Sequence, residues 1–161
     1  MPKVDIDGFE IYYEISGEGT PLVMIMGLGA NSEWWNEEII NQLNDSFKVM
    51  ILDNRGTGRS DDPGVEFTIK DLAEDVVKLM DKVNIPKAHI LGISMGGMIA
   101  QELALNFPEK LIKLVLCSTN CGGSKSIPPS REVLKILSKP RKGRSIDEIV
   151  EETIPLLYAL S

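Results

Sequence analysis

Residues 88–99 (AHILGISMGGMI) decide the fold. The stretch 89–93 is short and apolar, which is typical of a buried strand, whereas residues 95–107 place apolar side chains at helical spacing. Between them, residues 92–96 have the pattern Gly-x-Ser-x-Gly. This pattern, set between a strand and a helix, predicts a tight turn with Ser94 at its apex.

The turn around Ser94 has a chemical use. A strained strand-to-helix turn pushes the serine hydroxyl away from the backbone, and glycine neighbours let the strand and helix approach closely. The backbone N–H of Met95, at the start of the helix, is then placed to bind a developing oxyanion. We therefore predict Ser94 as a nucleophile and Met95 as an oxyanion donor. The alternative is a glycine-rich turn in which Ser94 only caps the helix.

The segments on both sides of this turn alternate between strand and helix patterns. Thr68 is the expected N-cap of the clearest helix, and Asp71 completes an acidic variant of the capping box. Asn31 or Ser32 is the expected cap of the first helix. Strands separated by helices predict an α/β fold with a mostly parallel sheet. The expected strands are 11–15, 22–26, 47–52, 89–93 and 111–116, and the expected helices are 35–43, 68–83 and 95–107.

A second glycine-rich loop, Met-Gly-Leu-Gly at residues 26–29, directly follows a buried strand. Its glycines allow the loop to fold back over the sheet edge, and the N–H of Leu28 is our candidate for the second oxyanion donor. The alternative is an ordinary strand-to-helix loop. Two tryptophans follow; either could line a substrate pocket, although one of them is better explained as a packing anchor. The predicted pocket residues are Gly27, Gly29, Trp34 and Trp35.

Residues 53–60 (DNRGTGRS) lie between these two loops. The order MGLG, DNRGTGRS, GISMGG and LVLCSTN resembles the α/β-hydrolase superfamily, in its enol-lactonase, haloperoxidase and methylesterase-like branch. The resemblance spans residues 4–120, and more loosely 127–160 as the first helices of a cap. It implies an α/β-hydrolase fold and a serine hydrolase that acts on a carboxylic ester or lactone through an acyl-enzyme on Ser94, without a cofactor. Residues 53–60 are similar to its D-x-R-G-x-G-x-S signature, which we interpret as structural, shaping a turn near the site, rather than as catalytic. Met26 departs from the resemblance, because many relatives have a histidine there.

The superfamily orders its catalytic triad as serine, then an acid, then histidine. This sequence has one histidine, His89, which precedes Ser94 and is interpreted as a sheet-facing side chain. We find no triad acid or histidine for Ser94, and we therefore expect little or no turnover from these residues alone. The expectation is an N-terminal portion, truncated within the cap region. Its expected parts are the hydrolase core at 1–120 and a linker with the start of a helical cap at 121–161. Within the second part we expect helices at about 130–137 and 145–160, with the basic stretch KPRKGR at 139–144 between them.

The composition limits the other function classes. Seventeen Lys and Arg against 24 Asp and Glu give a net charge of −7, which argues against general nucleic-acid binding. No apolar run approaches the length of a membrane span, and no secretory signal opens the sequence. Cys117 and Cys121 cannot form a disulfide framework or a four-ligand zinc site, so we expect a cytoplasmic protein with reduced thiols and no metal. The remaining alternative is a non-catalytic binding module, or a fragment that self-associates or complements a partner through an unpaired sheet edge.

Overall fold

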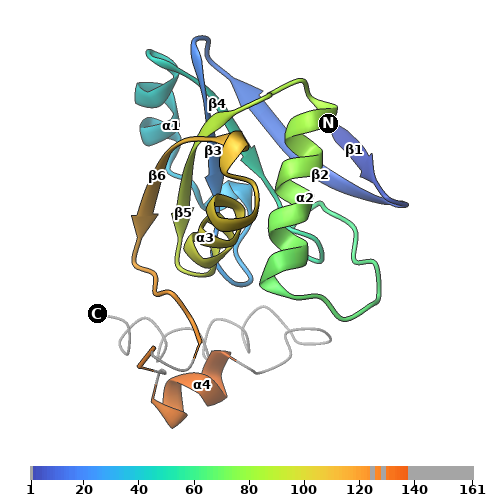
Figure 1. Ribbon diagram of the computed structural model, residues 1–161, viewed down its shortest axis with the longest axis vertical. Helices are drawn as coiled ribbons and strands as arrows, with labels where there is room; N and C mark the ends of the chain where they lie inside the picture. Colours follow the sequence, from blue (N-terminus) through green and yellow to red (C-terminus); the bar gives the residue numbers. More distant parts are fainter. Residues whose placement is uncertain (1, 124–125, 128–129, 138–161) are drawn as a thin grey trace. The chain divides into compact units, whose positions relative to one another are not determined.

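A computed structural model describes residues 2–123, 126–127 and 130–137. At its centre is a six-stranded sheet in the order β1-β2-β4-β3-β5-β6 (Figure 1). Strands β4, β3, β5 and β6 run parallel to one another, whereas β2 pairs antiparallel with both β4 and β1. The predicted α/β class with a mostly parallel sheet is therefore confirmed. The strands are β1 (Lys3–Ile6), β2 (Phe9–Ser16), β3 (Thr20–Ile25), β4 (Phe47–Leu52), β5 (Ala88–Ile93) and β6 (Leu111–Cys117).

Helices cover both faces of this sheet. Helices α2 and α3 lie together on one face (Figure 1), and α1 packs against β4 on the other. This arrangement is possible because parallel neighbours need crossover connections, and the crossovers are the helices. The helices are η1 (Ser32–Trp34), α1 (Glu37–Asn44), α2 (Ile69–Lys82), α3 (Met95–Asn106), η2 (Pro108–Lys110) and α4 (Arg131–Leu137).

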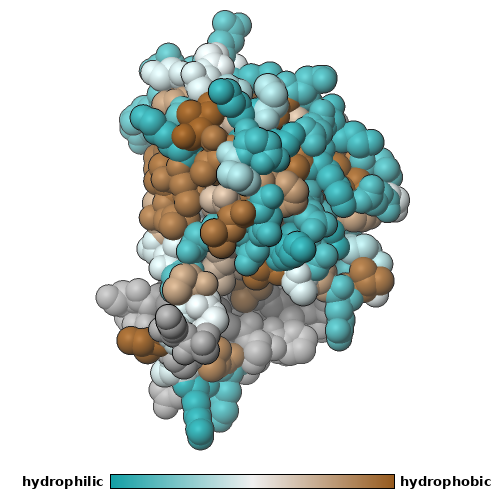
Figure 2. All heavy atoms as spheres, in the orientation of Figure 1, coloured by the Kyte–Doolittle hydropathy of each residue, from teal (hydrophilic) through white to brown (hydrophobic). Residues whose placement is uncertain are grey.

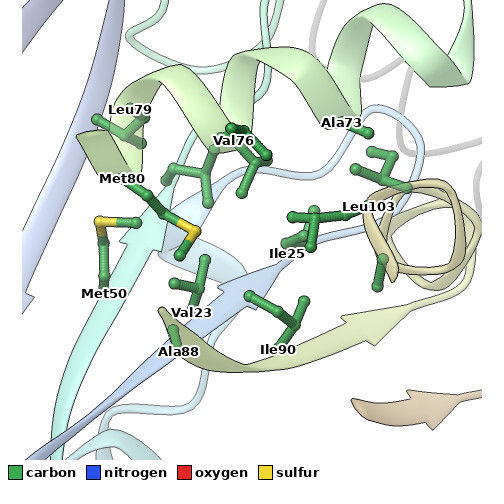
Figure 3. Close-up of a cluster of buried hydrophobic side chains, with 14 of the residues drawn as sticks. Val23, Ile25, Met50, Ala73, Val76, Leu79, Met80, Ala88, Ile90 and Leu103 are labelled. Atoms are coloured by element: carbon green, nitrogen blue, oxygen red, sulfur yellow. The ribbon is translucent and has the colours of Figure 1, made fainter. Parts of the chain in front are cut away.

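The side chains of β3 alternate between two apolar clusters. Val23 and Ile25 point towards α2 and α3, where they meet fully buried residues such as Val76 and Leu103 (Figure 3). Leu22 and Met24 belong to the cluster on the α1 side. A strand buried on both faces is a continuous apolar run rather than an alternating one, which explains the sequence LVMI.

The predicted cap of α2 is confirmed, but the predicted start of the first helix is wrong. The Thr68 hydroxyl accepts the N–H of Asp71, and the Asp71 carboxylate accepts the N–H of Thr68. In the earlier segment, Asn31 caps only the short η1 helix. Trp35 then takes an extended conformation, and Asn36 caps α1 by accepting two backbone N–H groups. The expected cap, Asn31, and the helix that was expected to follow it thus belong to two separate helices, η1 and α1, each with its own asparagine cap.

The chain separates into two compact units, Met1–Gly122 and Gly123–Ser161. Helix α4 belongs to the second unit and confirms the helix expected near residues 130–137. The expected helix at 145–160 and the basic stretch at 139–144 lie outside the described residues. The interpretation of residues 121–161 as a linker and cap stays a prediction. None of the described helices is both long enough and apolar enough to span a bilayer.

Candidate active site

The turn between β5 and α3 has the geometry that its sequence predicts. Ser94 has φ 55° and ψ −121°, in a region that a residue with a Cβ enters only under strain. Its side chain is exposed and makes no capping hydrogen bond to α3, in contrast to Thr68 at the start of α2. This observation disfavours the alternative in which Ser94 serves only as a helix cap. The hydroxyl is therefore available for other chemistry.

Close backbone approach explains the glycines around Ser94. A Cβ on Gly92 would lie 2.2 Å from the carbonyl oxygen of Gly96, and one on Gly96 would lie 2.1 Å from that of Ile25. A Cβ on Gly97 would lie 2.6 Å from the side chain of Thr119. Carbon and oxygen atoms cannot approach to such distances, so these three positions require glycine.

The Met-Gly-Leu-Gly loop after β3 lies directly against the turn. The position of a Cβ on Gly27 is 3.1 Å from the Cβ of Ser94 and 3.5 Å from its hydroxyl oxygen. Leu28 is 53% exposed, and Gly29 has φ 68°. On the other side of Ser94, the N–H of Met95 belongs to the first turn of α3, where backbone donors have no partner within the helix. The two predicted oxyanion donors thus belong to the two segments that flank Ser94.

A buried carboxylate organises the DNRGTGRS loop. Asp53 is fully buried, and its two oxygens accept the backbone N–H groups of Ser32 at 2.7 Å and Arg59 at 2.8 Å. A Cβ on Gly58 would lie 2.2 Å from an Asp53 oxygen, so only glycine allows this approach. The loop is thereby fastened to η1, which follows the Met-Gly-Leu-Gly loop. These contacts agree with the interpretation of the motif as structural.

Three further contacts hold the same loop to its surroundings. The Asn54 amide donates to the carbonyl of Met26 at 3.3 Å, and the Ser60 hydroxyl accepts the N–H of Tyr12 at 2.9 Å. The guanidinium of Arg59 lies 3.7 Å from the centre of the Tyr12 ring. Burial raises the pKa of Tyr12 to about 12, and a hydrogen bond to Glu14 acts in the same direction.

Arg55 connects this loop to α2. Its guanidinium forms two hydrogen bonds of 2.6 Å with the carboxylate of Asp75, and it lies over the rings of Phe9 and Phe67. The hydrogen bonds to Asp75 raise the pKa of Arg55. Both side chains are largely removed from water, so removing either one would leave the other as a buried, unpaired charge and would strongly destabilise the fold. Arg55 is therefore a structural residue, as the motif predicts.

The carboxyl end of β6 and the residues that follow it contact Ser94 in a way that the sequence analysis missed. The N–H of Ser94 donates to the carbonyl of Cys117 at 3.0 Å, and the hydroxyl of Thr119 donates to the carbonyl of Ser94 at 2.7 Å. Ser118, between them, has φ 44°. The only sequence signal for this contact is the position of the segment directly after a strand next to β5.

The predicted pocket residues divide into two groups. Gly27 lies against Ser94, and Gly29 belongs to the same loop. Trp34 is 64% exposed, whereas Trp35 packs against the cluster on the α1 side, as expected for a packing anchor. Trp35 also lines a cavity of 360 Å³, whose lining does not include Ser94; the other residues that line it are Glu14, Ser32, Glu33, Glu37, Ile40, Ile51 and Arg59.

His89 lies at the opposite end of β5 from Ser94. Its ring packs edge-on against Phe47, with centroids 5.8 Å apart. Five residues of extended strand separate the two positions by about 16 Å, whereas a base must lie within hydrogen-bond reach of its proton. The interpretation of His89 as a sheet residue is consistent with this contact. Within the described residues, no group of three or more His, Cys, Asp or Glu side chains is placed to hold a metal ion.

Comparisons with known proteins agree with this fold. Residues 20–144 match the model of the alpha/beta hydrolase fold family. The chain is 37% identical to a 2-hydroxy-6-oxononadienedioate/2-hydroxy-6-oxononatrienedioate hydrolase of Pseudomonas putida, over 98% of this chain and 57% of that protein. It is 34% identical to a putative carbamate hydrolase, RutD, of Azorhizobium caulinodans, over 72% of this chain and 43% of that protein.

A solved structure shows the same fold. The enol-lactonase of Burkholderia xenovorans superposes with a TM-score of 0.76 at 26% identity, over 99% of this chain and 66% of that one. The chain spans about half the length of the two curated relatives named above. Its family is nevertheless clear from the fold, the turn at Ser94 and the matched residues: the chain belongs to the α/β-hydrolase family.

Proposed function

We propose that this chain carries the nucleophile and oxyanion hole of a serine hydrolase that acts on a carboxylic ester or lactone. The observation that carries this proposal is the backbone of Ser94, at φ 55° between β5 and α3, with its hydroxyl exposed and free of capping bonds. The substrate class is supported by the relatives, which include proteins named enol-lactonase.

The reaction begins when the Ser94 oxygen attacks the substrate carbonyl while a base takes the hydroxyl proton. The carbonyl oxygen becomes an oxyanion, which the N–H groups of Leu28 and Met95 bind, and the dipole of α3 favours its negative charge. Collapse of this intermediate breaks the bond to the alcohol oxygen, which takes up a proton, and leaves Ser94 acylated. Water then adds to the acyl group and releases the acid and the free serine.

This mechanism needs a base for Ser94, and none is identified among the described residues. His89 is the only histidine of the sequence, and it lies at the far end of β5. A serine hydroxyl without a positioned base is a weak nucleophile. We therefore propose that these residues alone turn over little substrate, and that a base supplied from outside restores acylation of Ser94.

Intact mass spectrometry with a fluorophosphonate tests this proposal. We expect little labelling in buffer and labelling of one site when imidazole is added as a base. Ser94→Ala should abolish the label, whereas Ser118→Ala, which removes a nearby exposed hydroxyl, should retain it. A folded protein that is never labelled at Ser94 in imidazole would contradict the proposal. Fast labelling of Ser94 without imidazole would show that another group acts as base.

A second candidate function is association through β6. This strand pairs with β5 along one side, and within the described residues no strand pairs with its other side. Figure 2 shows a hydrophobic area over β6, where Ile112, Val115 and Leu116 are exposed. An apolar unpaired edge favours pairing with another chain. Light scattering of the same preparation tests this, and a monomer at all concentrations would contradict it.

A further inference from the structure

We infer that Thr119 is a positioning residue for the nucleophile Ser94. This inference deepens the proposed function and rests on it. Thr119 lies in the segment 117–120, at the carboxyl end of β6, and its hydroxyl acts on the backbone carbonyl of Ser94. No contact of Thr119 with the serine hydroxyl is required.

Both backbone polar groups of Ser94 are bound by this one segment. The Ser94 N–H donates to the carbonyl of Cys117 at 3.0 Å. The Thr119 hydroxyl donates to the Ser94 carbonyl at 2.7 Å. That carbonyl also accepts the N–H of Gly97 at 2.9 Å, so Thr119 and the first turn of α3 share one acceptor. The strained residue is held from both sides.

The packing around Thr119 is equally specific. Its side-chain atoms lie 2.6–2.7 Å from the position of a Cβ on Gly97, so Gly97 leaves the space that Thr119 fills. The amide of Gln101 donates to the carbonyls of Asn120 at 2.9 Å and Gly97 at 3.1 Å, which joins the segment to α3 a second time. The segment 117–120 is thus fixed against the amino end of α3.

Strain explains why such fixing matters. A non-glycine residue at positive φ persists only when its surroundings hold it there. Ser94 and Ser118 both have positive φ, at 55° and 44°. The Thr119 hydrogen bond joins the two segments that contain these strained residues. Without that bond, Ser94 can relax and turn its side chain away from the amino end of α3. All these atoms belong to the unit Met1–Gly122.

A cysteine introduced at position 94 reports on this geometry, because alkylation of a thiol does not need a histidine as base. In Ser94→Cys, the amino end of α3 should lower the pKa of the introduced thiol and speed its alkylation relative to exposed Cys121. We would measure the rate of iodoacetamide modification of each cysteine against pH by peptide mass spectrometry, in the full 161-residue chain. Cys121 serves as the internal reference.

Substitutions at Thr119 then separate positioning from general stability. Thr119→Val in the Ser94→Cys chain should slow alkylation of the introduced thiol about two- to tenfold at pH 7, the range expected for one lost hydrogen bond, and shift its pH profile upward. Thr119→Ser, which keeps the hydroxyl, should stay within about twofold of the parent. Thr68→Val is the matched control, because it removes a hydroxyl bonded at the start of α2.

Three results would overturn the inference: an introduced thiol no more reactive than Cys121, an unchanged rate and pH profile in Thr119→Val, or an equal slowing in Thr68→Val. If Thr119→Val does not fold, Gln101→Met replaces it and should slow alkylation in the same direction; equal rates would then reject the inference. Alkylation needs no general base, whereas phosphonylation of Ser94 in imidazole does. Failure of the proposed function and failure of this inference are therefore distinguishable.

Discussion

Two turns at the carboxyl edge of the parallel sheet are stabilised in opposite ways. The turn at residues 92–97 is shaped by missing side chains, since a Cβ on Gly92 or Gly96 would fall within about 2 Å of a carbonyl oxygen. The turn at residues 53–60 also needs one glycine, Gly58, but it is built around the buried carboxylate of Asp53 and the N–H groups that this carboxylate binds. The first turn should therefore be most sensitive to added volume, whereas the second should be sensitive to altered charge or hydrogen bonding as well.

The largest effect is expected from Gly96→Ala. The new methyl group would lie 2.1 Å from the carbonyl oxygen of Ile25 and 2.8 Å from that of Met26, and both are backbone atoms of the central strand region. Because neither can move away cheaply, the cost should reach or exceed the upper end of the roughly 1–3 kcal/mol typical of overpacking. Urea unfolding followed by circular dichroism measures it.

Gly64→Ala is a control without crowding, although it adds the strain of a positive φ that Gly96 does not have. Gly64 has φ 69° and no atom within 4 Å of a built Cβ, so the change there tests backbone strain without crowding. A cost of about 1–2 kcal/mol is expected from strain alone. Equal losses at the two positions would mean that close approach does not shape the turn at Ser94.

Asp53→Asn should give the next largest effect. The substitution keeps the shape but replaces one acceptor oxygen with an NH2 group, which then faces the N–H of Ser32 or Arg59. A buried donor without an acceptor, and the loss of a charged hydrogen bond, should together lower the free energy of unfolding by about 2–3 kcal/mol. Asp62→Asn, at an exposed carboxylate that accepts the N–H of Gly64, should change it by less than about 0.5 kcal/mol. Similar values for both would contradict the central role of Asp53.

The first of these turns could be predicted from sequence, and the reason is local. The pattern Gly-x-Ser-x-Gly combines a strand, a turn and a helix within about ten residues, and the close contact of Gly92, with the carbonyl of Gly96, lies within the pattern itself. The contact of Gly96 with the carbonyl of Ile25 depends instead on the neighbouring strand β3. The capping box of Thr68 and Asp71 is equally local, and both predictions are confirmed in the structure. Local patterns specify local geometry because the partners are fixed in number and spacing along the chain.

The partners that complete the two turns could not be predicted in the same way. Thr119 is 25 residues from Ser94, and Ser32 is 21 residues from Asp53. Such pairs depend on which strands become neighbours, and the order β4-β3-β5-β6 is set by the whole sheet. The motif at residues 53–60 indicated a structural turn, but a single sequence does not show which donors its buried carboxylate binds. The division of the first helix was missed for a local reason, since Asn36 is a second cap directly after Trp35.

At neutral pH, the smallest change in the free energy of unfolding is expected from a substitution at Tyr12. Its dependence on pH distinguishes the turn at residues 53–60 from the turn at residues 92–97. Tyr12, in β2, contacts the turn at residues 53–60. Its N–H donates to the Ser60 hydroxyl at 2.9 Å, and its ring lies under the Arg59 guanidinium. Burial raises the pKa of its phenol from 10.0 to about 12. The unfolded chain therefore loses this proton near pH 10, while the folded chain keeps it until about pH 12. The contribution of the protonated Tyr12 to the free energy of unfolding is fully present below pH 10 and is lost as the pH rises from 10 to 12.

Tyr12→Phe should remove that alkaline loss while costing about 1 kcal/mol at pH 7, where only the hydrogen bond to Glu14 disappears. Urea unfolding at pH 8, 10 and 11 measures the difference in the free energy of unfolding between parent and variant. This difference should narrow with rising pH, because only the parent has the phenol of Tyr12. Parallel curves for the two proteins would show that the turn at residues 53–60 has no special alkaline sensitivity, and the contrast between the two turns would then rest on packing alone.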